Sequence, residues 1–256
     1  MALTLYDAEN GIDGLDCTTT TLGASAPESA ANGNGGFRRF TSQAARVGML
    51  GYHFKAVTGQ NSYWRVNITA STVQAFRGIF RMVALPAATR RILQYRTDTG
   101  SLDSNRFMLQ ITSSGQLQIT DTLFATVGTV ATLSAGVDYD ISLTATVGAS
   151  TNDSQVTAKI YQKNSSVQVG STFSSSTANF SNNAGGSALI ESVYLGSPDT
   201  PAADFEYYWD FLRFGNDQGE FAAPIAASAA LPASTSFTAG ARPVPFVSQS
   251  LLGLEE

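Results

Sequence analysis

Aromatic side chains in the first half of the sequence are the residues best suited to bind a sugar. Tyr63, Trp64 and Tyr95 stand in segments of β character. An exposed aromatic ring can stack on the apolar face of a sugar, while nearby polar groups hold its hydroxyls. These three residues, with Tyr207 as a fourth, are therefore candidates for glycan stacking. The alternative, which the sequence leaves open, is that they belong to the hydrophobic core or to an interface.

Acidic residues near the start of the chain are the best candidates for metal binding. Asp7, Glu9, Asp13 and Asp16 lie close together beside Gly14. Calcium prefers clustered oxygen ligands, and loops often supply them. The spacing does not match an EF-hand loop. The segment is therefore either a weak calcium site or an acidic turn exposed to solvent, and no other cofactor is indicated.

The sequence offers few residues that are suited to hydrolysis. A glycosidase needs two carboxylates that face a cleft. Glu206 and Asp210 share a strand face with Tyr208 between them, and we expect Asp210 to accept backbone hydrogen bonds instead. The sole histidine, His53, stands in an alternating strand with no nucleophile beside it, and Cys17 in a polar loop is predicted to be an ordinary free thiol. We therefore expect no enzyme.

Composition excludes several further classes. The formal net charge is −5, and no basic stripe is visible, so we expect no nucleic-acid partner. A single cysteine allows no internal disulfide, and a single histidine cannot build a histidine metal site. No apolar run is long enough for a membrane span. The first residues lack the basic and apolar regions of a signal peptide, so we expect the chain to be made in a cytoplasm.

Short β-strand patterns recur from Phe37 onward, with turn residues between them. Apolar residues alternate with others over 137–147, and the turn residues of 113–115 separate two strand patterns. A strand that includes Leu123 and Phe124 is also predicted, over 122–132. Roughly a dozen such strands, with almost no helical periodicity, are typical of a sandwich or a barrel.

The densest aromatic run lies at 204–217 and predicts the last strong strand. Alternation places Phe205, Tyr207, Trp209 and Phe211 on one face, and Tyr208, Leu212 and Phe214 on the other. A strand that is apolar on both faces is expected to be covered on both faces. The sequence therefore predicts that this strand lies inside a layered β-structure.

The chain divides into three segments by composition. Residues 1–36 are predicted to form a strand and a loop segment that pack on the sandwich, and residues 37–217 form the sandwich itself. Residues 218–256 are rich in alanine and proline, which opposes regular structure, yet they contain many apolar side chains. We expect an extended arm that docks on a partner rather than a loose tail. Its proposed docking residues are Phe221, Ile225, Phe237, Phe246, Leu251 and Leu252.

Five segments, taken in order, resemble the laminin-G-like or concanavalin-A-like jelly roll. They are a long strand at 73–82, a hairpin with glycine in its turn at 107–117, a turn and strand at 133–143, a strand and turn at 158–165, and a closing strand at 208–214. At 137–139 the chain lacks the tryptophan that members often carry. The resemblance covers about residues 37–217. It implies an all-β, two-sheet antiparallel jelly-roll sandwich.

Domains of this kind occur often in bacteriophage head and tail proteins, and the resemblance carries expectations about function. It implies a structural virion protein, above all a minor tail component, that acts through contacts with other virion proteins and assembles as a homo-oligomer. The alternatives are a carbohydrate-binding module that recognises a glycan on the host surface and a protein that decorates the capsid. The expected location is the virion.

Overall fold

The computed structural model describes residues 3–6, 13–14, 17, 29–32, 37–46, 50–60, 62–97, 105–150, 152–163, 165, 167–181, 189–197 and 204–216. Within these ranges the structure is β-strand and loop, with one short 3-10 turn, η3, at Ser42–Ala44. None of the helices in the described ranges is long and apolar enough to cross a membrane. The predicted arm at 218–256 lies outside the described residues.

The first of two sheets has eight strands in the order β13-β12-β11-β6-β15-β4-β3, with β1 pairing β15. Every pair in it is antiparallel. The strands are β1 Leu3–Tyr6, β3 Phe37–Thr41, β4 Gly51–Ala56, β6 Val73–Met82, β11 Tyr139–Thr146, β12 Ser154–Gln162, β13 Phe173–Ala178 and β15 Phe205–Gly215.

The second sheet has seven strands in the order β10-β9-β8-β7-β14-β5-β2, again all antiparallel. The strands are β2 Ser29–Asn32, β5 Ser62–Ser71, β7 Arg90–Arg96, β8 Asn105–Ile111, β9 Gln116–Thr120, β10 Thr126–Thr132 and β14 Ile190–Ser197. The turn predicted between β8 and β9 is present. Gly115 has φ +80 there, and a Cβ at this position would lie 2.4 Å from the Leu133 carbonyl oxygen, so only glycine fits.

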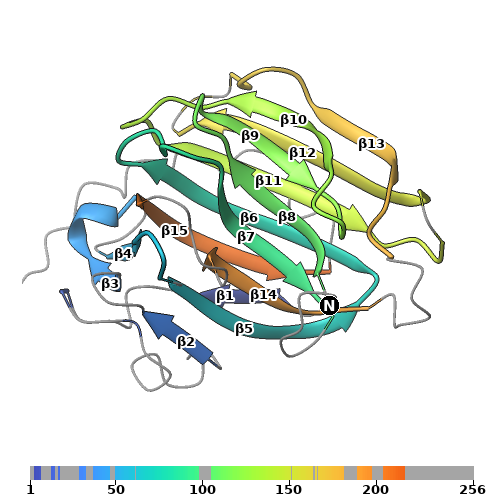
Figure 1. The fold of residues 1–256 in the computed structure, drawn as a ribbon, viewed down its shortest axis with the longest axis horizontal. Coiled ribbons are helices and arrows are strands. Elements are labelled where there is room, and N and C mark those ends of the chain that lie inside the picture. Colours follow the sequence, from blue (N-terminus) through green and yellow to red (C-terminus); the bar gives the residue numbers. More distant parts are fainter. Residues whose placement is uncertain are drawn as a thin grey trace, which may run out of the picture.

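The two sheets overlap face to face, with their strands in two layers (Figure 1). Side chains that alternate inward from both sheets form one core. Strand β11 illustrates the pattern, because Ile141, Leu143 and Ala145 point into the core as the alternation predicts. The prediction of an all-β, two-sheet antiparallel jelly-roll sandwich is confirmed. The largest fully buried side chains are Trp64, Trp209, Tyr52, Tyr95, Tyr207, Phe40, Phe54, Phe76, Phe80, Phe107, Phe180 and Phe214.

The aromatic strand β15 lies in the middle of the first sheet, between β6 and β4. Its register against β6 shifts between Asp210 and Arg213, where β15 carries one extra residue. Phe211 lies in this bulge with φ +51 and is only partly buried. The strict alternation predicted for this strand is therefore wrong beyond Asp210, since Leu212 joins Trp209 in the core.

Strand β10 begins at Thr126, so the strand predicted over 122–132 is wrong at its start. Asp121 closes a turn there, because its carboxylate accepts hydrogen bonds from the backbone N–H groups of Leu123 and Ala125, both at 2.9 Å. Leu123 and Phe124 have high β propensity, but this turn leaves both side chains exposed.

Candidate functional site

Polar side chains line the outer face of the second sheet. Arg65 on β5, Tyr194 on β14 and Gln94 on β7 are register partners in one row across the sheet. The residues next to them in sequence, such as Tyr95 and Val193, belong to the core. Because side chains alternate along a strand, the row points away from the core. We call Arg65, Gln94, Arg96 and Tyr194 the guanidinium cluster.

Tyr194 is the centre of the guanidinium cluster. The Cζ atom of Arg96 lies 4.3 Å from the Tyr194 ring centroid, and that of Arg65 lies 5.9 Å away. Tyr63 packs its ring on Tyr194 with 5.3 Å between centroids. Tyr194 itself is buried, whereas Tyr63 and Arg65 are partly exposed. The cluster therefore reaches solvent at its β5 side.

Hydrogen bonding within the guanidinium cluster is incomplete. Arg96 Nη2 donates to Gln94 Oε1 at 3.0 Å, and Arg65 Nη2 donates to Asn67 Oδ1 at 2.9 Å. The buried Nε of Arg65, Nε of Arg96 and Nε2 of Gln94 have no hydrogen-bond partner among the described residues. Buried donors are almost always paired in folded proteins, so an acceptor on a ligand would complete the hydrogen bonding of these three groups.

The charge of the guanidinium cluster is also unbalanced. Burial lowers the pKa of Arg96, while charge and hydrogen-bond interactions with Tyr194 oppose that shift. Arginine nevertheless stays charged in proteins. In the described part of the chain, no carboxylate lies within ion-pair distance of Arg65 or Arg96. A buried cation without a counter-ion is costly, so the cluster is suited to an anion.

A second row on the same face lies nearer the β10 edge. Arg91, Gln110, Gln118 and Thr129 are register partners across β7, β8, β9 and β10. Gln110 Nε2 donates to Gln118 Oε1 at 3.1 Å, and Gln118 Nε2 donates to Thr129 Oγ1 at 3.3 Å. None of these four side chains is fully buried. We call them the glutamine row, and their amides are accessible to hydroxyl groups.

Two of the three predicted glycan-stacking residues are core residues. The Trp64 side chain is fully buried, with its ring centroid 4.9 Å from that of Tyr52. Tyr95 is also fully buried, and its ring stacks on Phe107 at 4.5 Å. Burial raises the pKa of the Tyr95 phenol well above its usual value. Neither ring has a free face for a sugar, so this assignment is corrected; of the three, Tyr63 alone lies on the outer face.

The remaining candidates are placed by the structure as follows. Asp210 accepts hydrogen bonds from the backbone N–H of Arg46 at 2.5 Å and of Phe211 at 2.7 Å, as expected. Cys17, expected in a polar loop, is fully buried in the core. Asp13 accepts hydrogen bonds from Ser42 N at 3.2 Å and Ser42 Oγ at 3.0 Å.

The calcium prediction remains open. Asp7, Glu9 and Asp16 lie outside the described residues. Within the described ranges, no three carboxylate, histidine or cysteine side chains come together as a metal site. Asp13 by itself does not make a calcium site.

His53 lies on the outer face of the first sheet. Its Nε2 is 2.7 Å from Glu206 Oε1, and its ring packs on Tyr208 with 4.4 Å between centroids. Burial lowers the pKa of His53, and the hydrogen bond and charge of Glu206 oppose this shift. Because a carboxylate only accepts hydrogen bonds, the Nε2 atom of His53 is the donor in this contact. This arrangement packs the histidine onto the sheet, between Glu206 and the Tyr208 ring.

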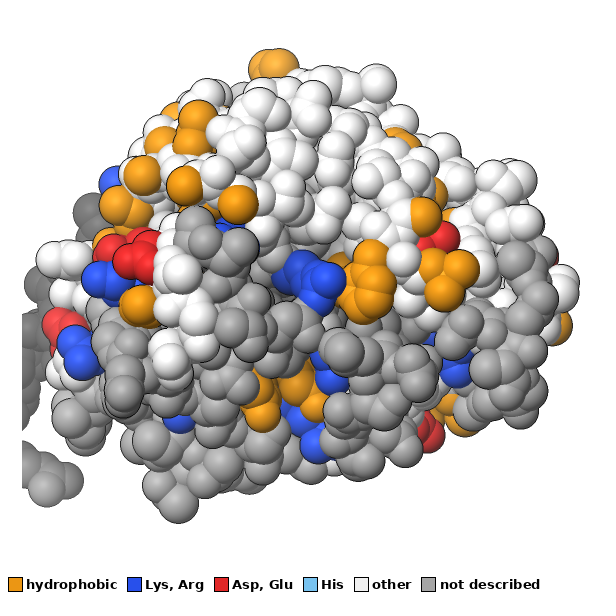
Figure 2. Space-filling view, viewed as in Figure 1, with side chains coloured by type: hydrophobic (Ala, Val, Ile, Leu, Met, Phe, Trp, Pro, Cys, Tyr) orange, Lys and Arg blue, Asp and Glu red, His pale blue; other side chains and the backbone are white. Residues whose placement is uncertain are grey.

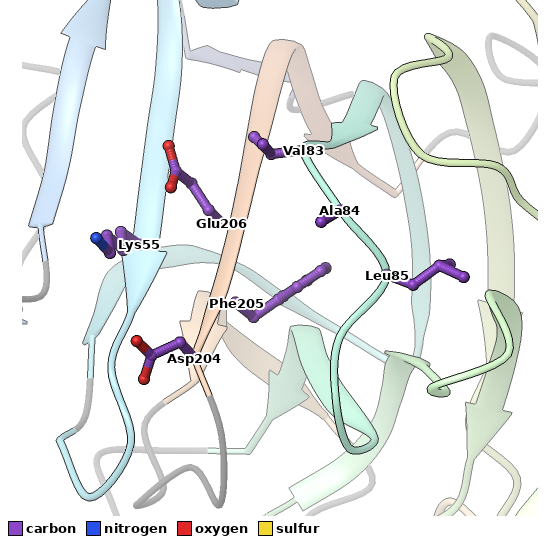
Figure 3. Close-up of a pocket in the computed structure, with 7 residues that line it drawn as sticks. All are labelled: Lys55, Val83, Ala84, Leu85, Asp204, Phe205 and Glu206. Atoms are coloured by element: carbon purple, nitrogen blue, oxygen red, sulfur yellow. The ribbon is translucent and has the colours of Figure 1, made fainter.

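A pocket of about 270 Å³ adjoins Glu206 on the same side (Figure 3). Figure 3 shows Lys55, Asp204 and Glu206 on one side and the apolar residues on the other. The carboxylate of Asp204 accepts hydrogen bonds from Thr58 N at 2.7 Å and Thr58 Oγ1 at 2.9 Å, so it holds the adjacent turn. The pocket offers mixed charge and a small apolar wall. The guanidinium cluster, with its unpaired buried donors, is the stronger candidate site.

Comparisons with known proteins bear on the fold. No family model matches the chain, and no curated protein matches it. Among solved structures, an endo-β-1,4-glucuronan lyase from the fungus Trichoderma reesei is similar, with a TM-score of 0.55, 13% identity, and 76% of this chain and 93% of that chain covered.

Two further similar structures are also carbohydrate-active proteins. An alginate lyase of polysaccharide lyase family 7 has 10% identity and a TM-score of 0.47. The matched region covers 84% of this chain and 94% of the lyase chain. A carbohydrate esterase from the Shiga toxin-encoding bacteriophage phi24B has 18% identity and a TM-score of 0.44, and covers 73% of this chain and 88% of its own.

The expectation that the chain is no enzyme is corrected by the comparison with the glucuronan lyase. That lyase indicates that a fold of this kind can carry an enzyme. The sequence argument against a glycosidase addresses only one way of using the fold for catalysis. Chemistry that uses guanidinium, amide and phenol groups remains compatible with the outer face of the second sheet.

Proposed function

We propose that this chain recognises an acidic polysaccharide on the outer face of the second sheet, with the guanidinium cluster as the binding centre. The observation that carries the proposal is the pair Arg65 and Arg96, which flank Tyr194 without a carboxylate partner among the described residues. A sugar carboxylate would supply the missing counter-charge. The fold shared with a glucuronan lyase supports this class of ligand.

The donors of the guanidinium cluster are of the kinds that bind a carboxylate. Arg96 Nε and Gln94 Nε2 are the unpaired donors on β7, and Arg96 already binds the amide oxygen of Gln94. Two donors on neighbouring groups can hold the two oxygens of one carboxylate, and such charge-assisted bonds are strong. Tyr63 lies at the exposed side and offers a ring to the adjacent sugar.

β-Elimination is the reaction that these groups support. Neutralising a uronate carboxylate makes the proton on the adjacent carbon easier to remove. Tyr194 is the phenol of the cluster and is our candidate for the proton carrier. The proton leaves that carbon, a C=C bond forms, the C–O bond to the next sugar breaks, and the leaving oxygen receives a proton.

The test replaces Arg96 by glutamine. We expect the wild-type chain to bind polyglucuronate more tightly than a neutral glucan, and Arg96→Gln to weaken that binding by roughly 10- to 100-fold, the range for a lost charge-assisted hydrogen bond. Titration calorimetry at low and high salt measures both affinities. The ultraviolet absorbance of new C=C bonds reports cleavage.

The matched control is Arg81→Gln on the opposite sheet, which should leave binding unchanged. Thermal unfolding of each variant checks that the fold is intact. Equal affinity of the wild-type chain for the acidic and the neutral polymer would contradict the proposal. So would wild-type affinity in the Arg96→Gln variant.

We also propose, from the sequence resemblance, that the chain works in a bacteriophage virion as a minor tail component, with a glycan of the host surface as its polysaccharide. Other virion proteins and further copies of the chain would be its partners, and a place on the capsid is the alternative. We expect an antibody to detect the chain on purified particles, and a chain ending at residue 217 to be lost from them. Incorporation of the shortened chain would contradict a docking role for the arm at 218–256.

A further inference from the structure

An exposed aromatic residue occupies an unfavourable backbone conformation beside the glutamine row. Phe124 has φ +64, in the left-handed region, and 41% of the residue is exposed. A bulky residue with positive φ is an outlier, because the left-handed region is unfavourable for a residue that carries a Cβ. Glycine or asparagine would remove most of that cost. A strained, exposed phenylalanine is therefore more consistent with a role in binding than with a role in folding.

The turn holds Phe124 in this position through Asp121. The backbone N–H of Phe124 donates to the Asp121 carbonyl at 3.1 Å, and Asp121 N donates to the Ala125 carbonyl at 2.9 Å. The Asp121 carboxylate binds the N–H groups on both sides of Phe124, at Leu123 and Ala125. The ring is thus presented by a preorganised turn and does not depend on burial.

One face of the Phe124 ring is covered by a cation from the sheet. The Arg91 guanidinium carbon lies 4.3 Å from the ring centroid. Burial lowers the pKa of Arg91, as does its neighbour Arg96. Arg91 begins the glutamine row, whose amides continue from it across β8 and β9. Figure 2 shows basic and hydrophobic side chains side by side near the centre of the drawn face.

We infer that Phe124 and Arg91 form a distal sugar subsite, in which the ring stacks on a sugar residue bound along the glutamine row. This inference rests on the proposed function. Gln94 and Arg96 of the guanidinium cluster lie on β7 together with Arg91, which is five residues from Arg96, or about 17 Å along the strand at the usual rise per residue, so a short run of sugars can join the two sites. The ligand class is a polysaccharide that runs along β7, with a carboxylate at the guanidinium cluster and a less charged sugar face at Phe124.

The arrangement explains why the two ends of the face differ. The guanidinium cluster is buried and unbalanced in charge, so it selects an anion. The glutamine row is accessible, and beyond Arg91 its groups are two amides and a hydroxyl, which bind hydroxyls without selecting a charge. At the Arg91 end of the row, the Phe124 ring offers apolar contact to one face of a sugar. The Arg91 guanidinium packs on the Phe124 ring and stabilises its position.

The test replaces Phe124 by glycine and compares ligands of different length. We expect affinity for a long acidic oligosaccharide to fall about 3- to 10-fold, and affinity for a short one that fills only the guanidinium cluster to stay unchanged. The thermal midpoint of Phe124→Gly should hold or rise, because glycine accepts the positive φ. Phe124→Tyr, which keeps the ring, should retain the wild-type affinity for long ligands.

Leu123→Ala is the matched control, since Leu123 belongs to the same turn and is 64% exposed. It should alter neither affinity. If Phe124→Gly binds long and short ligands as the wild-type chain does, the subsite is overturned while the proposed function stands. If the wild-type chain binds no acidic polysaccharide of any length, both are overturned. A fall of the thermal midpoint in Phe124→Gly would instead assign the ring a structural role.

Discussion

Replacing Arg77 by methionine should lower the free energy of unfolding by about 3–5 kcal/mol, the range for breaking a buried ion pair by removing one partner. Arg77 on β6 and Asp140 on β11 form a bidentate pair on the outer face of the first sheet. Arg77 Nε lies 3.1 Å from Asp140 Oδ1, and Nη2 lies 2.7 Å from Oδ2. Both residues are buried, with 6% and 3% exposed. The change leaves a buried carboxylate without its cation.

The stability lost in Arg77→Met should be smaller at acidic than at neutral pH. Burial raises the pKa of Asp140, and the charge and hydrogen bonds of Arg77 oppose that rise. Without Arg77 the folded state takes up a proton at Asp140 more readily than the unfolded state does. The cost of Arg77→Met should therefore shrink as the pH falls toward the ordinary aspartate pKa of about 3.9. Urea denaturation at neutral and acidic pH measures the cost.

A double change separates charge from packing. Arg77→Met combined with Asp140→Leu removes both charges and should recover most of the lost stability, because an apolar pair can replace a buried ion pair without penalty. The difference in the free energy of unfolding between the single and the double variant should be the quantity that varies with pH. If the double variant is as unstable as Arg77→Met, the carboxylate is not the cause.

Replacing Trp209 by alanine should destabilise the sandwich by about 3–5 kcal/mol, as for other large aromatic residues removed from a core. Trp209 is fully buried in the middle of β15 and packs against Phe80 and Phe76, with ring centroids 4.8 and 5.4 Å away. Gly78 makes room for it, because a Cβ there would lie 3.1 Å from Trp209 Cζ3. Differential scanning calorimetry measures the loss.

Trp209→Phe serves as the comparison for this prediction. The indole Nε1 of Trp209 has no hydrogen-bond partner in the described part of the structure, so phenylalanine forfeits no such bond. We expect a smaller cost, about 1–2 kcal/mol, from the reduced volume alone. Similar stability of the alanine and phenylalanine variants would mean that the core collapses around the site.

Much of the fold could be predicted from the sequence because strand patterns are local. The alternation of β11 and the glycine turn at Gly115 both appear where the residues predict them. Faces were harder to assign, because Tyr63 and Trp64 are adjacent aromatics and alternation alone does not say which of them points inward. The β propensity of Phe124 predicts a strand, and the Asp121 turn overrides that preference.

The site could not be predicted from spacing. Arg65, Gln94 and Tyr194 come from three strands that are far apart in the chain, and only the sheet register makes them neighbours. A row that crosses the strands leaves no run of like residues in the sequence, so no basic stripe is visible in it. The one local signal is Gln94 followed by Arg96 two positions later, which places both on the same face of β7.

The position of β15 has a consequence for how the protein is made. Of the described strands it is the last to leave the ribosome, yet it lies between β6 and β4, which are synthesised much earlier. Until it is inserted, β3 and β4 have no link to the rest of their sheet, and two long strand edges stay open. Translation that stalls before Phe205 should therefore yield a chain that aggregates or requires a chaperone, rather than a partly folded sandwich.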